Sequence, residues 1–82
     1  MAHKDVEYHV EDEVFKDPKD AFVAVCNECI SHGSARLDVV IWSKAGAKAF
    51  GGDDAVEQYL EDPDASVFER FEFKCNAVGR VP

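Results

Sequence analysis

The feature that most constrains the fold is a stretch of helical periodicity, residues 17–33, that has both a start and a stop signal. Asp17 is a favourable N-cap, and Pro18 follows it at the first helical position. Gly33 supplies the left-handed residue that commonly ends a helix. The apolar residues between them recur at three- and four-residue spacing and are Phe22, Val25, Cys26, Cys29 and Ile30. These signals predict a helix from about residue 18 to residue 31 that buries this stripe.

Two stretches on either side of the helix have the pattern of β-strands. Residues 6–15 alternate as far as Val10, and the acidic residues 11–13 are expected to bulge or turn. Residues 36–42 have apolar side chains on both faces, which is typical of a central strand. The face of this strand that we expect the helices to cover carries Leu37, Val39 and Ile41.

The remaining chain predicts two short helical segments and a last strand. Ser43 is a possible N-cap, and Gly51 with Gly52 breaks the helical pattern before it resumes and stops ahead of Pro63. Residues 67–81 alternate strongly, so one side of this strand faces the core and the other faces water. The core side is expected to include Phe71 and Phe73. The order β-α-β-α-β predicts a single α+β domain over residues 1–82: a two-layer sandwich with a mixed sheet of about three strands and two or three helices on one face.

Charge and composition narrow the classes of function. The chain has 82 residues, and its 17 acidic against 9 basic residues give a net charge of −8. Such an excess of acid disfavours nucleic acid and acidic membrane surfaces as partners. No apolar run is long enough to span a membrane, and the N-terminus does not resemble a signal peptide. With an odd number of cysteines, 3, the sequence predicts a cytoplasmic protein with free thiols.

The spacing of Cys26 and Cys29 resembles a redox or metal motif, but its position favours neither. Both thiols fall in the second half of the predicted helix, where the helix dipole opposes a thiolate. We therefore interpret them as small buried core residues. A zinc site that adds His32 and Cys75 is the alternative, although the chain has only one such cysteine pair.

A second candidate is the turn that opens the helix after the central strand. Ser43, Lys44 and Lys48 could bind an anion there, although the spacing matches no known phosphate loop. The histidines His9 and His32 have no motif that pairs them with a nucleophile. The sequence therefore gives no positive support for catalysis or for a bound cofactor.

The last candidate is an apolar patch on the sheet face away from the helices. Trp42 and Val40 alternate with the residues assigned to the core, and Phe68 and Arg70 fall on the corresponding side of the last strand. Exposed patches of this kind mark contacts with partners. We expect a non-enzymatic binding or assembly module that self-associates as a homodimer or binds another protein. The alternatives are an anion- or ligand-binding protein and, third, a thiol or zinc protein.

Overall fold

A computed structural model describes residues 3–75 and has α+β architecture, with four strands and two helices among those residues. The elements in chain order are β1 (Val6–Val10), β2 (Glu13–Phe15), α1 (Pro18–His32), β3 (Ser34–Ile41), α2 (Lys44–Glu61) and β4 (Glu69–Lys74). The strands form one antiparallel sheet in the order β2-β1-β3-β4. The α+β class is therefore confirmed, and the expected two or three helices and about three strands are close to the two helices and four strands of the structure, but the sheet is antiparallel rather than mixed.

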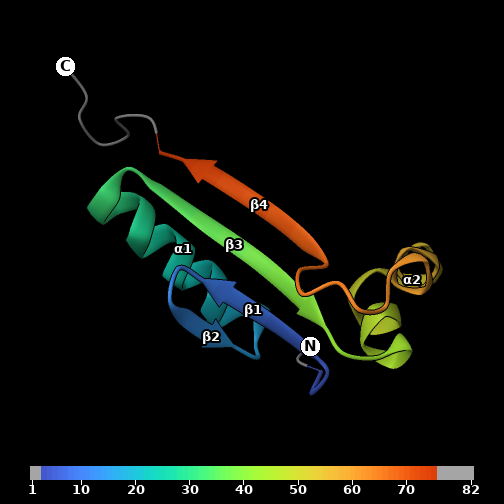
Figure 1. The fold of residues 1–82 in the computed structure, drawn as a ribbon. Coiled ribbons are helices and arrows are strands. Elements are labelled where there is room, and N and C mark those ends of the chain that lie inside the picture. The colour runs from blue at the N-terminus through green and yellow to red at the C-terminus, as the bar shows by residue number, and fades with distance from the viewer. Residues whose placement is uncertain (1–2, 76–82) are drawn as a thin grey trace.

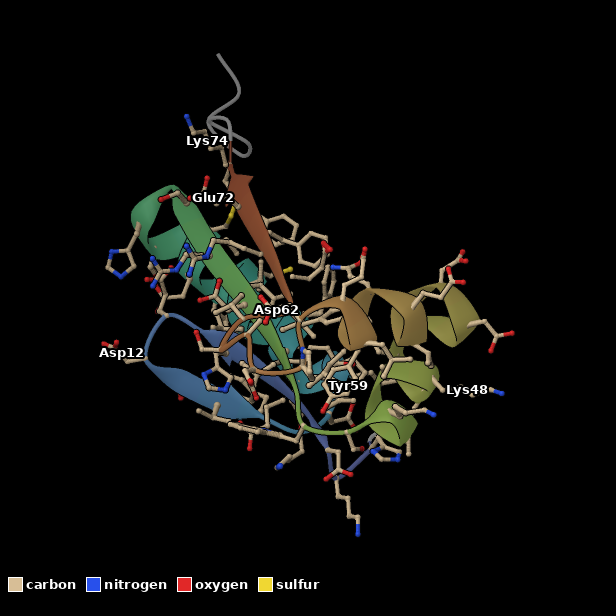
Figure 2. All side chains as sticks on the ribbon, turned by 45° about the vertical axis from the view of Figure 1, so that its right-hand side comes forward. Asp12, Lys48, Tyr59, Asp62, Glu72 and Lys74 are labelled. Atoms are coloured by element: carbon tan, nitrogen blue, oxygen red, sulfur yellow. A yellow bond between two sulfur atoms is a disulfide. The ribbon has the colours of Figure 1, made fainter. Side chains whose placement is uncertain are left out.

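A tight hairpin explains this difference. The chain turns between β1 and β2 at residues 11–12, and Figure 2 shows Asp12 at the tip. Glu11 has a φ of 52°, and its amide donates to the Arg36 carbonyl at 3.3 Å. The Arg36 amide donates in turn to the Glu11 carboxylate at 2.8 Å, which helps to hold this uncommon backbone conformation. The turn reverses the chain, so β1 runs antiparallel to both of its neighbours.

Helix α1 has the predicted ends but a different buried face. The Lys19 amide donates to the Asp17 carboxylate at 2.8 Å, and Gly33 ends the helix with a φ of 83°. The buried residues of the helix are Ala21, Val25 and Cys29. Phe22 and Ile30 are 65% and 82% exposed, so their assignment to the core is wrong. Small side chains at i, i+4 and i+8 face the sheet instead, where they permit a close approach of the helix.

Helix α2 is two helical segments joined at a kink, as the sequence predicts. Gly51 and Gly52 have non-helical dihedral angles, and Gly52 has a φ of 72°. The Gly46 amide donates to the Ser43 hydroxyl at 3.1 Å and completes the N-cap. This helix covers one end of the sheet, and α1 covers the other (Figure 1).

The core therefore consists of two clusters on the same face of the sheet. The first, beneath α2, contains Val6, Val39, Ile41, Ala47 and Ala55. The second, beneath α1, contains Val10, Ala21, Val25, Cys29 and Ala35. Tyr8 packs against both clusters, so β1 and β3 are the strands that join the two halves of the core.

Strand β4 forms the outer strand beside β3. Phe71 pairs with Leu37 and Phe73 with Ala35, so both phenylalanines share the face that the helices cover on β3. The part of the predicted last strand in residues 76–81 lies outside the described residues.

Candidate interaction surface

The predicted outer-face patch is only partly assembled. Trp42 is exposed, at 61%, but Val40 is buried. Phe68 packs on the helix side in an edge-to-face contact with Phe50, with ring centroids 5.9 Å apart. The placement of Phe68 on the outer face is wrong because β4 begins only at Glu69, so the alternation does not extend to Phe68. The four residues therefore do not form one apolar patch.

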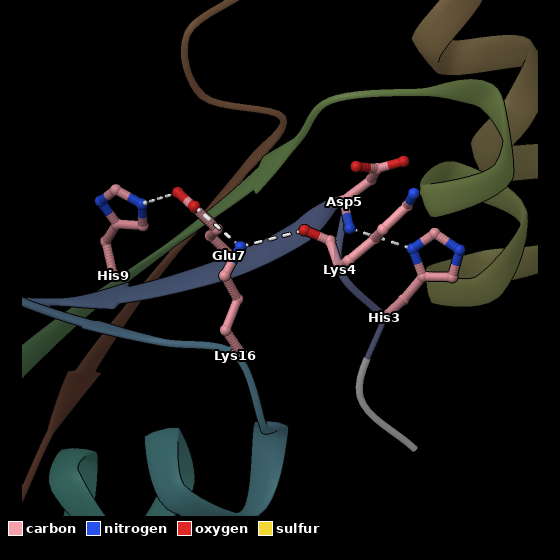
Figure 3. A network of polar contacts seen from close by, with 6 residues as sticks. All are labelled: His3, Lys4, Asp5, Glu7, His9 and Lys16. Carbon is pink, nitrogen blue, oxygen red and sulfur yellow. Dashed lines mark hydrogen bonds and ion pairs between the residues drawn. The ribbon is translucent and has the colours of Figure 1, made fainter.

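Polar contacts occupy the outer face around β1 and β3. Arg70 donates to the Asp38 carboxylate through Nε at 2.8 Å, and this contact raises the pKa of Arg70 above its usual value. On β1, the Glu7 carboxylate lies 3.0 Å from His9 Nε2 and 3.0 Å from Lys16 Nζ (Figure 3). Hydrogen bonds with His9 and then Lys16 lower the pKa of Glu7. The Arg70 contact joins β4 to β3, and the Lys16 contact joins the segment after β2 to β1, so these contacts support the pairing of neighbouring strands.

The candidate anion-binding turn is occupied by the chain's own carboxylate. The Ser43 hydroxyl donates to Asp5 Oδ2 at 2.7 Å. A Cβ at Gly46 would lie 2.9 Å from the Asp5 carbonyl oxygen, so the two backbones are in close approach. Lys44 and Lys48 are exposed, and Lys48 Nζ is 3.7 Å from an Asp53 carboxylate oxygen. The turn thus serves as a helix cap, with a negative charge where an anion would bind.

The three cysteines are not all free thiols, which corrects the sequence prediction. Cys29 and Cys75 form a disulfide with Cα atoms 5.5 Å apart, and Cys26 is free and half-buried. His32 is exposed and lies 3.3 Å from the Glu28 carboxylate. Within residues 3–75, no three His, Cys, Asp or Glu side chains converge as metal ligands would. The proposed zinc ligands are therefore not assembled as a set.

The disulfide identifies which side of α1 faces β4. Cys75 directly follows β4, so Cys29 lies on the β4 side of the helix. Helical geometry places Phe22, Cys26 and Ile30 on this same side. The opposite side borders a shallow hollow next to β2, whose lining includes Glu13, Phe15, Asp20, Ala24 and Glu28.

An exposed apolar surface results, which we call the α1–β4 flank. It consists of Phe22 and Ile30 from α1 and Phe71 and Phe73 from β4. Phe71 and Phe73 are 39% and 37% exposed although they lie on the helix side of the sheet. Figure 1 shows the reason: α1 lies behind β1 and β3, and β4 extends beyond it at the edge. This surface was not predicted from the sequence because all four residues have the spacing of core residues.

The backbone of β4 adds a second feature to the flank. Within the part of the chain that the structure describes, β4 is an outer strand paired only with β3. An outer strand presents amide and carbonyl groups that can pair with another strand. Figure 2 shows Glu72 and Lys74 along this strand. The flank thus combines apolar side chains with a strand edge.

Comparisons of the chain with protein-family models, with curated proteins and with solved structures find no match. Among the described residues, neither helix is long and apolar enough to cross a membrane.

Proposed function

We propose that this chain is a non-enzymatic protein-binding module and that the α1–β4 flank is its binding surface. The observation that carries the proposal is the exposure of Phe71 and Phe73 on the side of the sheet where β3 has its core residues. Large apolar side chains gathered beside an open strand edge are typical of surfaces that bind another chain.

The size of the exposed side chains supports this surface over the outer face. Complete burial of one large apolar side chain contributes about 1.5–3 kcal/mol. Phe22 and Ile30 are more than half exposed, so each retains much of that free energy for association. Trp42 is exposed to a similar degree, but it stands beside Glu7 on a polar face.

An uncharged, environment-sensitive dye such as Nile red tests whether the flank is an accessible apolar surface. Dilute wild-type protein is expected to bind the dye, and Phe22→Ser with Ile30→Ser is expected to abolish most of the fluorescence gain. Trp42→Ser is the matched control, because it removes an equally exposed aromatic from the other face. A wild type that binds no dye, or a loss seen only with Trp42→Ser, would contradict the proposal.

Location in the cell and the exclusion of nucleic-acid and membrane partners stay predictions. Disulfides persist mainly in oxidising compartments, so the Cys29–Cys75 bond disfavours the expected cytoplasmic location. Cells are quenched with acid, and free thiols are then alkylated after neutralisation. Mass spectrometry of the peptides with Cys29 and Cys75 measures how much of this pair is oxidised in the cell.

A further inference from the structure

The hydrogen-bonding phase of β4 determines which of its backbone groups face the open edge. The Cys75 amide donates to the Gly33 carbonyl at 2.9 Å. Bonded positions alternate along an antiparallel pair, so Phe71 and Phe73 direct their amides and carbonyls toward β3. The same groups of Arg70, Glu72 and Lys74 point away from β3, toward the edge.

The charges of β4 are complementary to those of a second, antiparallel copy. If Phe71 lies opposite Phe71 of the second copy, then Arg70 lies opposite Glu72 and Glu72 opposite Arg70. Directly opposed opposite charges stabilise a strand pair, and the two-fold symmetry produces this pair twice. The residues so paired are also those whose backbone groups face the edge, as hydrogen-bonded pairing requires.

Neighbouring registers lose this complementarity. A shift by two residues in one direction places Glu72 opposite Glu72 and Arg70 opposite Lys74. A shift in the other direction places Arg70 opposite Arg70. A shift by one residue would bring the core side of one strand to the outer side of the other. The charge pattern therefore disfavours these neighbouring registers. A register with Phe73 at the two-fold axis would instead place Glu72 opposite Lys74, and reversal of the Lys74 charge would weaken association only in that register.

We infer that the occupant of the α1–β4 flank is a second copy of this chain, paired β4 to β4 in an antiparallel sheet of eight strands with Phe71 at the two-fold axis. This inference rests on the proposed function and names its partner. The pairing also brings the apolar flanks of both copies to the same face of the joined sheet, around the central Phe71 pair. Because each chain carries a net charge of −8, added salt should strengthen association by screening the long-range repulsion.

Charge reversal tests the register. R70E and E72R each place two like-charged pairs across the proposed interface, and each is expected to weaken self-association by about tenfold to a hundredfold. An equimolar mixture of the two variants restores opposite charges at both cross-strand pairs and is expected to recover the wild-type dissociation constant as a heterodimer. The double variant R70E/E72R is expected to self-associate like the wild type. Sedimentation equilibrium at several concentrations measures all four samples.

The chain offers two matched controls. K74E reverses a charge on the same strand, but in this register Lys74 lies opposite Phe68, so little change is expected. In the register shifted by two residues Lys74 would face Arg70, and K74E would then strengthen association. W42A is expected to leave association unchanged, and a larger loss with W42A than with R70E would place the interface on the outer face and overturn the inference.

A measurement on the wild type avoids any effect of the variants on folding, because Arg70 also contacts Asp38 within the monomer. The amide exchange of Arg70 and Glu72 is expected to slow as protein concentration rises, whereas that of Phe71 should not change. A wild type that remains monomeric at millimolar concentration, or failure of the mixed variants to recover association, would overturn the inference. Dye binding in a monomeric chain would leave the proposed function standing and show that the partner is a different protein.

Discussion

Strands β3 and β4 lie side by side and have the same alternation, yet they end up in different environments. On β3, Val39 and Ala35 are 1% and 4% exposed on the helix side of the sheet. On β4, Phe71 and Phe73 occupy the same side and are 39% and 37% exposed. Alternation determines which face of a sheet a residue occupies, but the position of the helices determines whether that face is covered.

The difference arises from where α1 attaches. The helix packs over β1 and β3 through its small side chains and reaches the β4 side at its C-terminal end, through the Cys29–Cys75 disulfide. One helix cannot cover four strands that are about 4.8 Å apart. A domain of this size thus leaves one outer strand half-covered, and that strand becomes available for association.

Removing the disulfide is expected to have the largest effect on stability. The bond closes a loop with a sequence separation of 46 residues. In the chain-entropy model a loop of that length contributes about 4 kcal/mol. Cys75→Ser should lower the free energy of unfolding by about this amount, measured by urea denaturation, and reductant should have the same effect on the wild type. Cys26→Ser is the control, and equal stability with and without reductant would show that the β4 end is not held to α1.

The next largest effects on stability are expected from truncating a buried side chain of β3, and a smaller effect from truncating an exposed side chain of the α1–β4 flank. Val39→Ala removes a fully buried side chain and is expected to cost about 2 kcal/mol. Phe22→Ala removes a larger side chain that is 65% exposed, and the expected cost is under about 1 kcal/mol. Thermal melts of the two variants at low concentration test this order. If Phe22→Ala were the more costly change, the flank would be covered and the contrast between β3 and β4 would fail.

An element could be predicted from the sequence when the residues that determine it lie close together along the chain. The ends of α1 could be predicted because Asp17 and Gly33 act within one turn of the helix. The hairpin could be predicted only as a bulge or turn at residues 11–13, because Glu11-Asp12 lacks the glycine or asparagine that usually marks such a turn. It is held instead by bonds to Arg36, which is distant in sequence.

The flank was missed for a different reason. Two ridges of α1 have the same spacing, one with Ala21, Val25 and Cys29 and the other with Phe22, Cys26 and Ile30. The greater hydrophobicity of the second ridge favours its burial, but the sheet accepts the ridge with the smaller side chains. The pairing of Cys29 with Cys75 likewise depends on where β4 ends relative to α1, which no local pattern shows.

Neither α1 nor α2 covers the outer face of β3 or β4, so substitutions on that face should have the smallest effects, and the strongest candidate is Glu7 because it contacts both His9 and Lys16. Hydrogen bonds with His9, then Lys16, lower the pKa of Glu7 below the usual value of 4.5 in the folded state. A carboxyl group whose pKa falls on folding stabilises the folded state above its unfolded pKa. That contribution is lost as the pH falls through the lower, folded pKa.

Glu7→Gln is therefore expected to reduce the free energy of unfolding by less than about 1 kcal/mol at pH 7, because Lys16 is half exposed and solvent screens the pair. The difference between variant and wild type should shrink as the pH falls below 4.5 and should vanish once Glu7 is protonated in both states. Urea denaturation over a pH series from 7 downward measures it, with Glu61→Gln on the exposed end of α2 as control. A difference that did not shrink as the pH falls would mean that Glu7 acts through packing rather than charge. A loss above about 2 kcal/mol at pH 7 would show that the outer face is as well covered as the core of β3.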